Sequence, residues 1–304
     1  MQLIKPDINL DFVGKRKFAA LFSVILLAVG FLSLVIHGGP NYGIDFSGGT
    51  LVQVKFNQMT SAGDIKSALT GLELGSVVVQ QFGDEGNEFL IRSQNTSSEL
   101  KGLSQEISKI LEKNYGEGQV EVRRAEMVGP QVGKDLREKG LMAILYALIG
   151  ILIYVTWRFE FRFAVGAIIA LAHDVFITLG VFSLFGKEID LPIIAAFLAI
   201  IGYSLNDTII VYDRIRENMG KHGKDGFASV VNRSINETLS RTILTSGTTL
   251  MVVLALFTLG GGVIHNFAFA LLVGIIIGTY SSIFVASAIL VFWDNYRSAK
   301  KAES

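Results

Sequence analysis

An aspartate inside an apolar segment is the strongest constraint in this sequence. Asp207 lies in the run LPIIAAFLAIIGYSLNDTIIVY, which covers residues 191–212. A transmembrane helix needs about 20 predominantly apolar residues, so this run is long enough to cross a bilayer. A carboxylate at the centre of a membrane costs roughly 2.5–3.5 kcal/mol on an insertion scale. We therefore expect Asp207 to bind ions or protons, or to pair with a buried charge.

Apolar runs long enough to span a membrane recur along the chain, and 50% of its residues are hydrophobic. The predicted fold is an α-helical polytopic membrane protein. The first run has a basic flank like a signal peptide. Its apolar core is longer than that of a signal peptide and lacks a cleavage pattern, which predicts an uncleaved anchor. The six predicted transmembrane helices cover residues 18–36, 140–157, 163–185, 191–212, 242–260 and 266–293.

The distribution of Lys and Arg predicts the orientation of these helices. Basic residues gather in the N-terminal segment 1–17, near Arg158, in the loop 213–241 and in the tail 294–304. The short loops on the other side carry only Lys187. Because cytoplasmic loops are enriched in Lys and Arg, we expect both termini in the cytoplasm.

The polar stretch 37–139 is long enough to form a separate domain outside the membrane. Alternating apolar residues predict strands, and apolar residues at helical spacing predict two helices between them. The order βαββαβ is that of a ferredoxin-like α+β fold. The predicted strands cover residues 51–56, 77–82, 88–92 and 120–126, and the predicted helices residues 61–69 and 100–111.

Composition and motifs exclude several function classes. Lys plus Arg and Asp plus Glu both number 27, so no basic field indicates nucleic acid. The chain has no cysteine. We find no phosphate-binding loop, no dinucleotide-binding motif, no metalloprotease motif and no nucleophile–base set. The sequence predicts neither an enzyme nor a bound metal or cofactor, so energy has to come from a partner or from the membrane.

Four motifs carry a resemblance to a known family. They are YGIDFSGGT at residues 42–50, AHDVFITLG at 172–180, GYSLNDTIIVYDRIREN at 202–218 and SRTILTSGTT at 240–249. Together they resemble the SecD/SecF family of bacterial protein-export subunits, in the same order and over nearly the whole chain. The short outer domain fits the smaller SecF type rather than the larger SecD type.

The resemblance implies a function that the residues alone do not show. The family belongs to the resistance-nodulation-division (RND) superfamily of proton-driven proteins of the bacterial inner membrane. SecF-type chains pair with SecD in a twelve-helix unit that associates with the SecYEG channel and often with YajC. This unit uses the proton gradient, and no cofactor, to promote the export of unfolded polypeptides. Asp207 matches the family's intramembrane aspartate, and Arg241 matches the basic residue beside it.

Asp207 and Arg241 are the first candidate site residues. Asp213, six residues further along, marks the expected water boundary, which would place Asp207 about 9 Å below it. Asp207 is interpreted as a proton acceptor, tuned in opposite directions by desolvation and by Arg241, or as one half of a static ion pair. Ser204 and Tyr203 are expected to hydrogen-bond it. Arg241 is expected to begin the fifth helix, either as this partner or as an ordinary interfacial residue.

Three other ionisable residues are weaker candidates. His173 and Asp174 lie near the middle of the third helix. They are interpreted as proton carriers or as a polar plug between packed helices, connected to Asp207 only through water. For Asp213 we favour a salt link to the neighbouring RIREN cluster, residues 214–218, over a role in transport.

Glycines and other small residues indicate turns and close packing. One set surrounds the outer domain and predicts a tight turn and a matching hinge, with Asp45 as a turn residue. A second set recurs at every fourth position of the sixth helix and predicts a helix contact, either internal or with SecD. The first set is Gly43, Asp45, Gly48, Gly49, Gly129, Pro130 and Gly133, and the second is Gly274, Gly278, Ser282 and Ala286.

The resulting hypothesis is a proton-coupled machine in which protonation of Asp207 moves the outer domain against an emerging polypeptide. One alternative is a proton-coupled small-molecule exporter of the same superfamily. The other is a scaffold that stabilises the channel complex without transporting anything.

Overall fold

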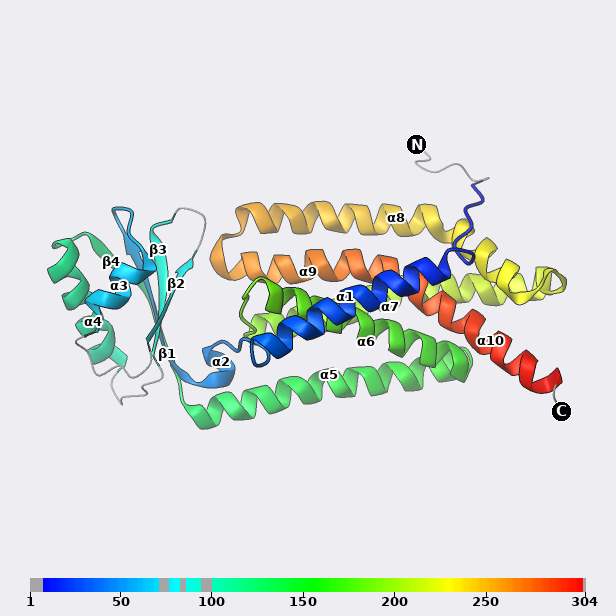
Figure 1. Cartoon of the computed structure of the whole chain (residues 1–304), viewed down its shortest axis with the longest axis horizontal. Helices are drawn as coiled ribbons and strands as arrows, with labels where there is room; N and C mark the ends of the chain where they lie inside the picture. The colour runs from blue at the N-terminus through cyan, green and yellow to red at the C-terminus, as the bar shows by residue number, and fades with distance from the viewer. Residues whose placement is uncertain (1–7, 71–76, 83–85, 94–99, 303–304) are drawn as a thin grey trace. The chain divides into compact units, whose positions relative to one another are not determined.

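The computed structural model describes residues 8–70, 77–82, 86–93 and 100–302 (Figure 1). The chain divides into two compact units. The first is an α+β unit formed by Tyr42–Leu141, and the second is a helical unit formed by the chain before and after it. Within the described residues, 6 helices are long and apolar enough to cross a membrane, which confirms the predicted fold class.

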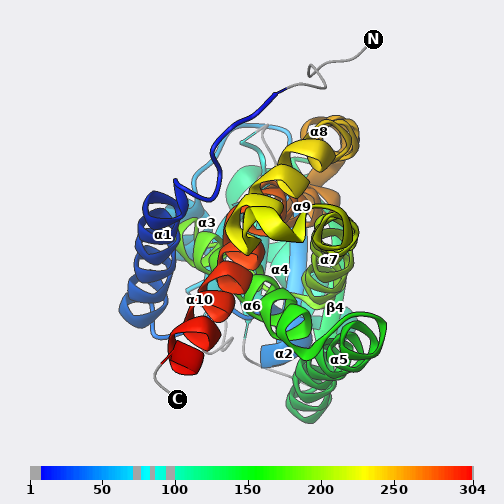
Figure 2. The ribbon, with the colours of Figure 1, turned by 90° about the vertical axis from the view of Figure 1, so that its right-hand side faces the viewer.

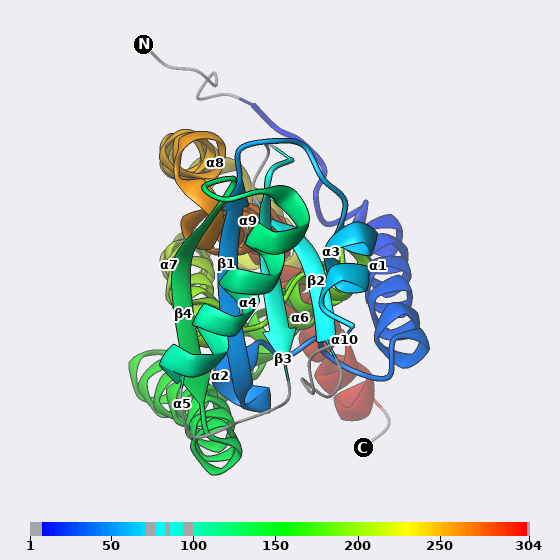
Figure 3. The ribbon, with the colours of Figure 1, turned by 90° about the vertical axis from the view of Figure 1, so that its left-hand side faces the viewer.

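The α+β unit has the predicted βαββαβ order. Its sheet has the strand order β2-β3-β1-β4, and all neighbouring strands are antiparallel. Figure 3 shows the helices α3 (Ala62–Ala68) and α4 (Leu100–Tyr115) on one face of this sheet. The core between the two layers includes Val54, Phe56, Ile65, Phe89 and Leu111. The elements are β1 (Gly49–Phe56), α3 (Ala62–Ala68), β2 (Val77–Phe82), β3 (Glu88–Ser93), α4 (Leu100–Tyr115) and β4 (Val120–Val128).

The helical unit is built from long helices that pack side by side (Figure 2). Of the six candidate spans, α6 is the most buried and α5 the least. Helix α9 continues through a short π-helical segment, Ser282–Ala286, into α10. The helices are α1 (Arg16–Ile36), α5 (Pro130–Arg158), α6 (Phe161–Leu184), α7 (Leu191–His222), α8 (Phe227–Leu259), α9 (Gly261–Ser281) and α10 (Ser287–Ala302).

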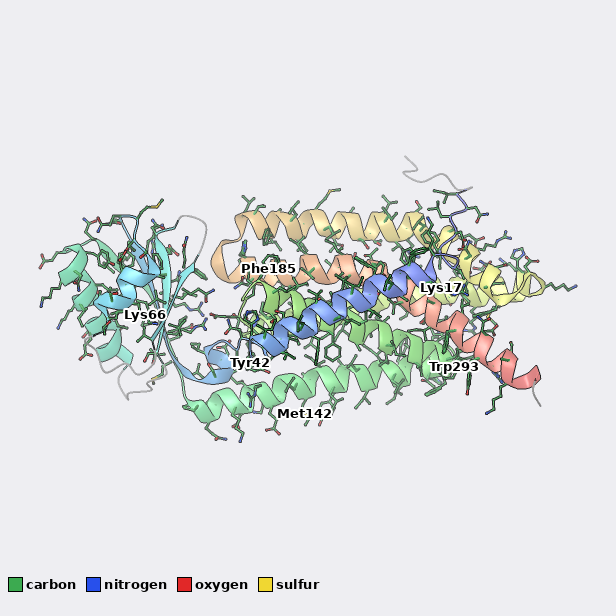
Figure 4. The ribbon with its side chains drawn as sticks, viewed as in Figure 1. Lys17, Tyr42, Lys66, Met142, Phe185 and Trp293 are labelled. Carbon is green, nitrogen blue, oxygen red and sulfur yellow. The ribbon has the colours of Figure 1, made fainter. Side chains whose placement is uncertain are left out.

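Residue types that favour a membrane interface lie at one end of the helical unit. Lys17 and Trp293 lie at one end, and Phe185 lies at the other (Figure 4). Lys17 belongs to the basic flank of the first helix, and Trp293 is an interfacial residue type. The orientation of this end relative to the cytoplasm remains a prediction.

The segment 213–241 differs from the predicted cytoplasmic loop. Helix α7 continues through it to His222 and α8 begins at Phe227, so it consists of two helical ends joined by a short turn. Ion pairs at helical spacing, Glu217–Lys221 and Arg233–Glu237, stabilise these polar ends. Likewise α5 begins at Pro130 and α10 extends to Ala302, because a helix need not end where its apolar segment ends.

Candidate functional site

Asp207 is buried on α7 and only partly hydrogen-bonded. Its side chain is 1% exposed. Oδ2 accepts a hydrogen bond of 3.2 Å from Ser246 Oγ on α8, and Ser246 in turn accepts one of 2.8 Å from Thr279 on α9. Oδ1 has no hydrogen-bond partner among the described residues. A buried carboxylate with one unsatisfied oxygen is costly when charged, and protonation removes that charge.

The neighbours expected from sequence are not the ones that contact Asp207. Ser204 donates instead to Asp174 at 2.6 Å, and Tyr203 donates to Thr249 at 3.3 Å. Their side chains extend towards α6 and α8 respectively, where these acceptors lie. Ser246 was missed, although it belongs to the quoted motif SRTILTSGTT. The available signal was the series Thr242, Ser246 and Thr249, which recurs at helical spacing within the predicted fifth span.

Arg241 lies in the middle of α8 rather than at the start of the fifth helix. Its side chain is exposed, whereas the following residue, Thr242, is buried. In the part of the chain that the structure describes, no ion pair joins Arg241 to Asp207. The interpretation of Arg241 as a charge partner of Asp207 therefore remains a prediction.

His173 and Asp174 form a fully hydrogen-bonded pair on α6. The pair lies 2.9 Å apart between His173 Nδ1 and Asp174 Oδ1, and both side chains are buried. Asp174 Oδ2 accepts hydrogen bonds from Ser204 on α7 at 2.6 Å and from Ser281 on α9 at 2.7 Å. His173 Nε2 lies 3.0 Å from Ser23 Oγ on α1. This pair therefore connects four helices through direct contacts.

Asp213 contacts a different helix from the one predicted. Arg158, the last residue of α5, pairs with it at 3.2 Å. Arg214 of the RIREN cluster pairs instead with Glu217 of the same cluster and with Glu237 on α8. Asp213 thus joins the last residue of α5 to a position on α7 that lies nine residues before this helix ends at His222.

The glycine motif at the base of the α+β unit is closely packed. Gly43 precedes a short helix, α2 (Ile44–Ser47), whose first turn holds Asp45. Gly48 and Gly49 have positive φ values of 72° and 121°, which favour glycine. A Cβ atom on Gly48 would lie 2.8 Å from Pro130 Cα.

The predicted second hinge forms the beginning of α5. Pro130 opens this helix, a position that suits proline because its missing N–H is not needed there. Gly133 lies inside the helix, and a Cβ atom on it would lie 3.0 Å from Gly48 N. Gly129 precedes the helix and has open space around it. Gly48, Pro130 and Gly133 therefore form a tight backbone contact.

The small residues of the sixth span pack inside this chain, against α7. Gly274 lies against Ile200, and Gly278 lies against Ser204. Further along, Ser282 and Thr208 are hydrogen-bonded at 2.8 Å. The last of the series, Ala286, accepts a hydrogen bond from Tyr212 at 3.5 Å. Both helices thus present every fourth residue to the other, and the contact is internal.

Fold and site together define a multi-pass membrane protein with ionisable groups buried between its helices. Comparison with known proteins agrees. The family model "Protein export membrane protein SecD/SecF, C-terminal" matches residues 107–296, and "SecD/SecF GG Motif" matches residues 34–58. The chain belongs to the SecD/SecF family of protein-export membrane proteins and, within it, to the SecF subunits.

The curated relatives match nearly the whole chain. A protein translocase subunit SecF of Desulfurispirillum indicum is 52% identical, covering 93% of this chain and 91% of that protein. A SecF of Rickettsia prowazekii is 42% identical, covering 99% and 96%. These relatives support an accessory role in protein export and favour neither a small-molecule exporter nor a scaffold.

Two solved structures share the fold. The crystal structure of SecDF from Thermus thermophilus, a translocon-associated membrane protein, matches with a TM-score of 0.86 at 40% identity. A crystal structure of SecDF in a "Super-membrane-facing form" matches with a TM-score of 0.71 at 39% identity. They cover 96% and 100% of this chain, which spans 40% and 41% of the length of those chains.

Proposed function

We propose that this chain is a non-catalytic accessory subunit of Sec-dependent protein export that uses the proton gradient. It acts in the bacterial inner membrane with both termini in the cytoplasm. It pairs with a SecD chain, since the SecDF chains that match it are more than twice its length. The complex works beside the SecYEG channel and YajC on unfolded polypeptides. It needs no cofactor besides the gradient.

The observation that carries this proposal is the hydrogen-bonding state of Asp207. Asp207 is buried, its Oδ1 atom has no partner among the described residues, and its Oδ2 atom accepts one bond from Ser246. Charged and protonated forms of such a group differ strongly in their interaction with the surrounding helices. Gain and loss of a proton at Asp207 would therefore change the packing between α7 and α8.

The available energy is sufficient for a conformational change. One charge that crosses the membrane contributes about 2.3 kcal/mol per 100 mV. Shifting a two-state equilibrium from 1:99 to 99:1 takes about 5.5 kcal/mol, which a few protons supply.

The test is preprotein translocation into inverted membrane vesicles that contain the complex, at saturating ATP, with and without a proton gradient. We expect Asp207→Asn, which cannot take up and release a proton, to abolish the gradient-dependent part and to leave the ATP-dependent part. Asp225→Asn is the control, because it makes the same change at an exposed aspartate in the short turn between α7 and α8. Full gradient-dependent stimulation by Asp207→Asn would exclude the proposed role.

A further inference from the structure

A chain of hydrogen bonds connects α1 to α7 through His173. Tyr280 on α9 donates to the carbonyl oxygen of Ala19 on α1 at 2.7 Å. Its hydroxyl oxygen lies 3.1 Å from Ser23 Oγ, which lies 3.0 Å from His173 Nε2. His173 continues to Asp174, and Asp174 continues to Ser204 on α7. Ser204 lies within one turn of Asp207, and α1 leads directly into the α+β unit.

The direction of the hydrogen bonds depends on whether His173 Nε2 carries a proton. Ser23 has one hydroxyl proton, and the proton of Tyr280 is used by Ala19. When Nε2 carries no proton, Ser23 donates to it, and no proton is left for the contact between Ser23 and Tyr280. When Nε2 carries a proton, Nε2–H donates to Ser23, and Ser23 donates to Tyr280. Only a proton on Nε2 satisfies both contacts of Ser23.

The titratable groups in contact with His173 come from α6 and α9. Asp174 is on the same helix, and Tyr280, which stacks on the imidazole at 6.2 Å between ring centroids, is on α9. These are the titratable groups in contact with it among the described residues. The helices α1 and α7 contribute hydroxyl groups to this network, Ser23 and Ser204.

Three contacts follow one another along α1 and α6 with a constant offset of 150 residues, so the two helices run parallel. Of these three, Ser23–His173 is the one that continues to α7. The middle contact is between two glycines, where a Cβ atom on Gly30 would lie 2.9 Å from Gly180 Cα. The three contacts are Ser23–His173 at 3.0 Å, Gly30–Gly180, and Ser33–Ser183 at 2.8 Å.

We propose that His173 is a positioning residue that, through its hydrogen bonds to Ser23 and Asp174, sets how firmly α1 is held against the core helices α6, α7 and α9. A displacement of α7 breaks or forms the Ser204–Asp174 contact, and the change passes through His173 and Ser23 to α1. The α+β unit follows, because α1 is one of its two connections to the membrane. This inference rests on the proposed function and identifies how Asp207 acts on the rest of the chain.

The experiment compares two hydroxyl groups of the same interface. Ser23→Ala removes the link to His173, whereas Ser33→Ala removes an equally buried Ser–Ser bond that does not lead to α7. We expect Ser23→Ala to lower the gradient-stimulated part of translocation about fivefold, the effect of one net hydrogen bond on a two-state equilibrium. Ser33→Ala should keep it, and Ser23→Thr, which keeps the hydroxyl, should restore it.

Tyr280→Phe provides a second variant that keeps the aromatic ring and removes the hydroxyl that reaches Ser23 and Ala19. It should behave like Ser23→Ala, and it replaces that variant if Ser23→Ala does not co-purify with the SecD chain. Equal losses in Ser23→Ala and Ser33→Ala would show a merely structural role and overturn the inference. So would unchanged stimulation in both Ser23→Ala and Tyr280→Phe. If Asp207→Asn abolishes stimulation in the same vesicles, the proposed function survives either of those results.

Discussion

At the scale of single residues, two buried aspartates differ in how completely they are hydrogen-bonded. Asp174 has partners on both oxygens, from three helices, whereas Asp207 has one partner on one oxygen among the described residues. A net hydrogen bond to a charged group contributes about 1.5–3 kcal/mol, and an unsatisfied buried group costs a similar amount. Asp174 is thus suited to holding helices together, and Asp207 to changing its charge.

Close approach of glycines gives a prediction at this scale. A Cβ atom on Gly180 would lie 2.5 Å from Gly30 Cα, so Gly180→Ala must push α1 and α6 apart. We expect it to lower the free energy of unfolding by about 1–3 kcal/mol, the usual cost of overpacking. The measurement is thermal unfolding in detergent.

Gly247→Ala is the matched control, because Gly247 lies inside α8 with open space around its Cα atom. It should be neutral or stabilising by up to about 1 kcal/mol, since alanine favours helix more than glycine does. Equal unfolding midpoints for the two variants would contradict the close contact.

At the scale of elements, the segment before α1 is held against α8 by two asparagines. The backbone N–H of Leu10 donates to Asn236 Oδ1 at 2.8 Å, and its carbonyl oxygen accepts from Asn232 at 3.0 Å. Asn232 Oδ1 also accepts from Phe12 N at 2.8 Å. These side chains complete the backbone hydrogen bonds of a segment that has no regular structure, and so fix its path across the helix.

Removing these asparagines should expose the segment. Trypsin sites lie just beyond it, at Lys15, Arg16 and Lys17. We expect the double variant Asn232→Ala, Asn236→Ala to be cleaved there at least about fivefold faster in detergent, because several net hydrogen bonds are lost. Asn114→Ala is the control, since Asn114 donates only to a carbonyl of its own helix. Cleavage at the wild-type rate in the double variant would show that the asparagines do not hold the segment.

At the scale of the whole molecule, the two units have separate cores. The α+β unit buries its own apolar cluster between sheet and helices, and its base is closed by the contact of Gly48 with Pro130. A unit with its own core can fold on its own. The helical unit has a different core, which includes Phe163, Tyr212 and Leu290.

This division predicts the behaviour of fragments. Residues 42–141 should fold as a soluble domain with a cooperative thermal transition. Residues 42–128 lack Pro130 and Gly133 and should melt at least about 5 °C lower, which corresponds to roughly 1 kcal/mol in a domain of this size. Circular dichroism on both fragments measures the difference. Identical melting temperatures would show that the start of α5 does not stabilise the domain.

The sequence by itself determined the class of the protein and the elements of both units. Apolar length fixed the six spans because hydrocarbon excludes polar backbone that is not hydrogen-bonded internally. Alternation of apolar residues fixed the strands, and residues 77–82 were predicted as a strand with the bounds that β2 has. The predictions for Asp207, Arg241 and His173 as functional residues remain to be tested by the experiments above.

Only the tertiary structure decided which side chains meet. Ser204 contacts Asp174 rather than Asp207, and Asp213 contacts Arg158 rather than its own neighbours, because the partners come from other helices. Periodicity places a residue on a face of its helix but does not say which helix lies opposite, or at what height. That choice depends on close contacts such as Gly30 with Gly180, which require two distant parts of the chain at once.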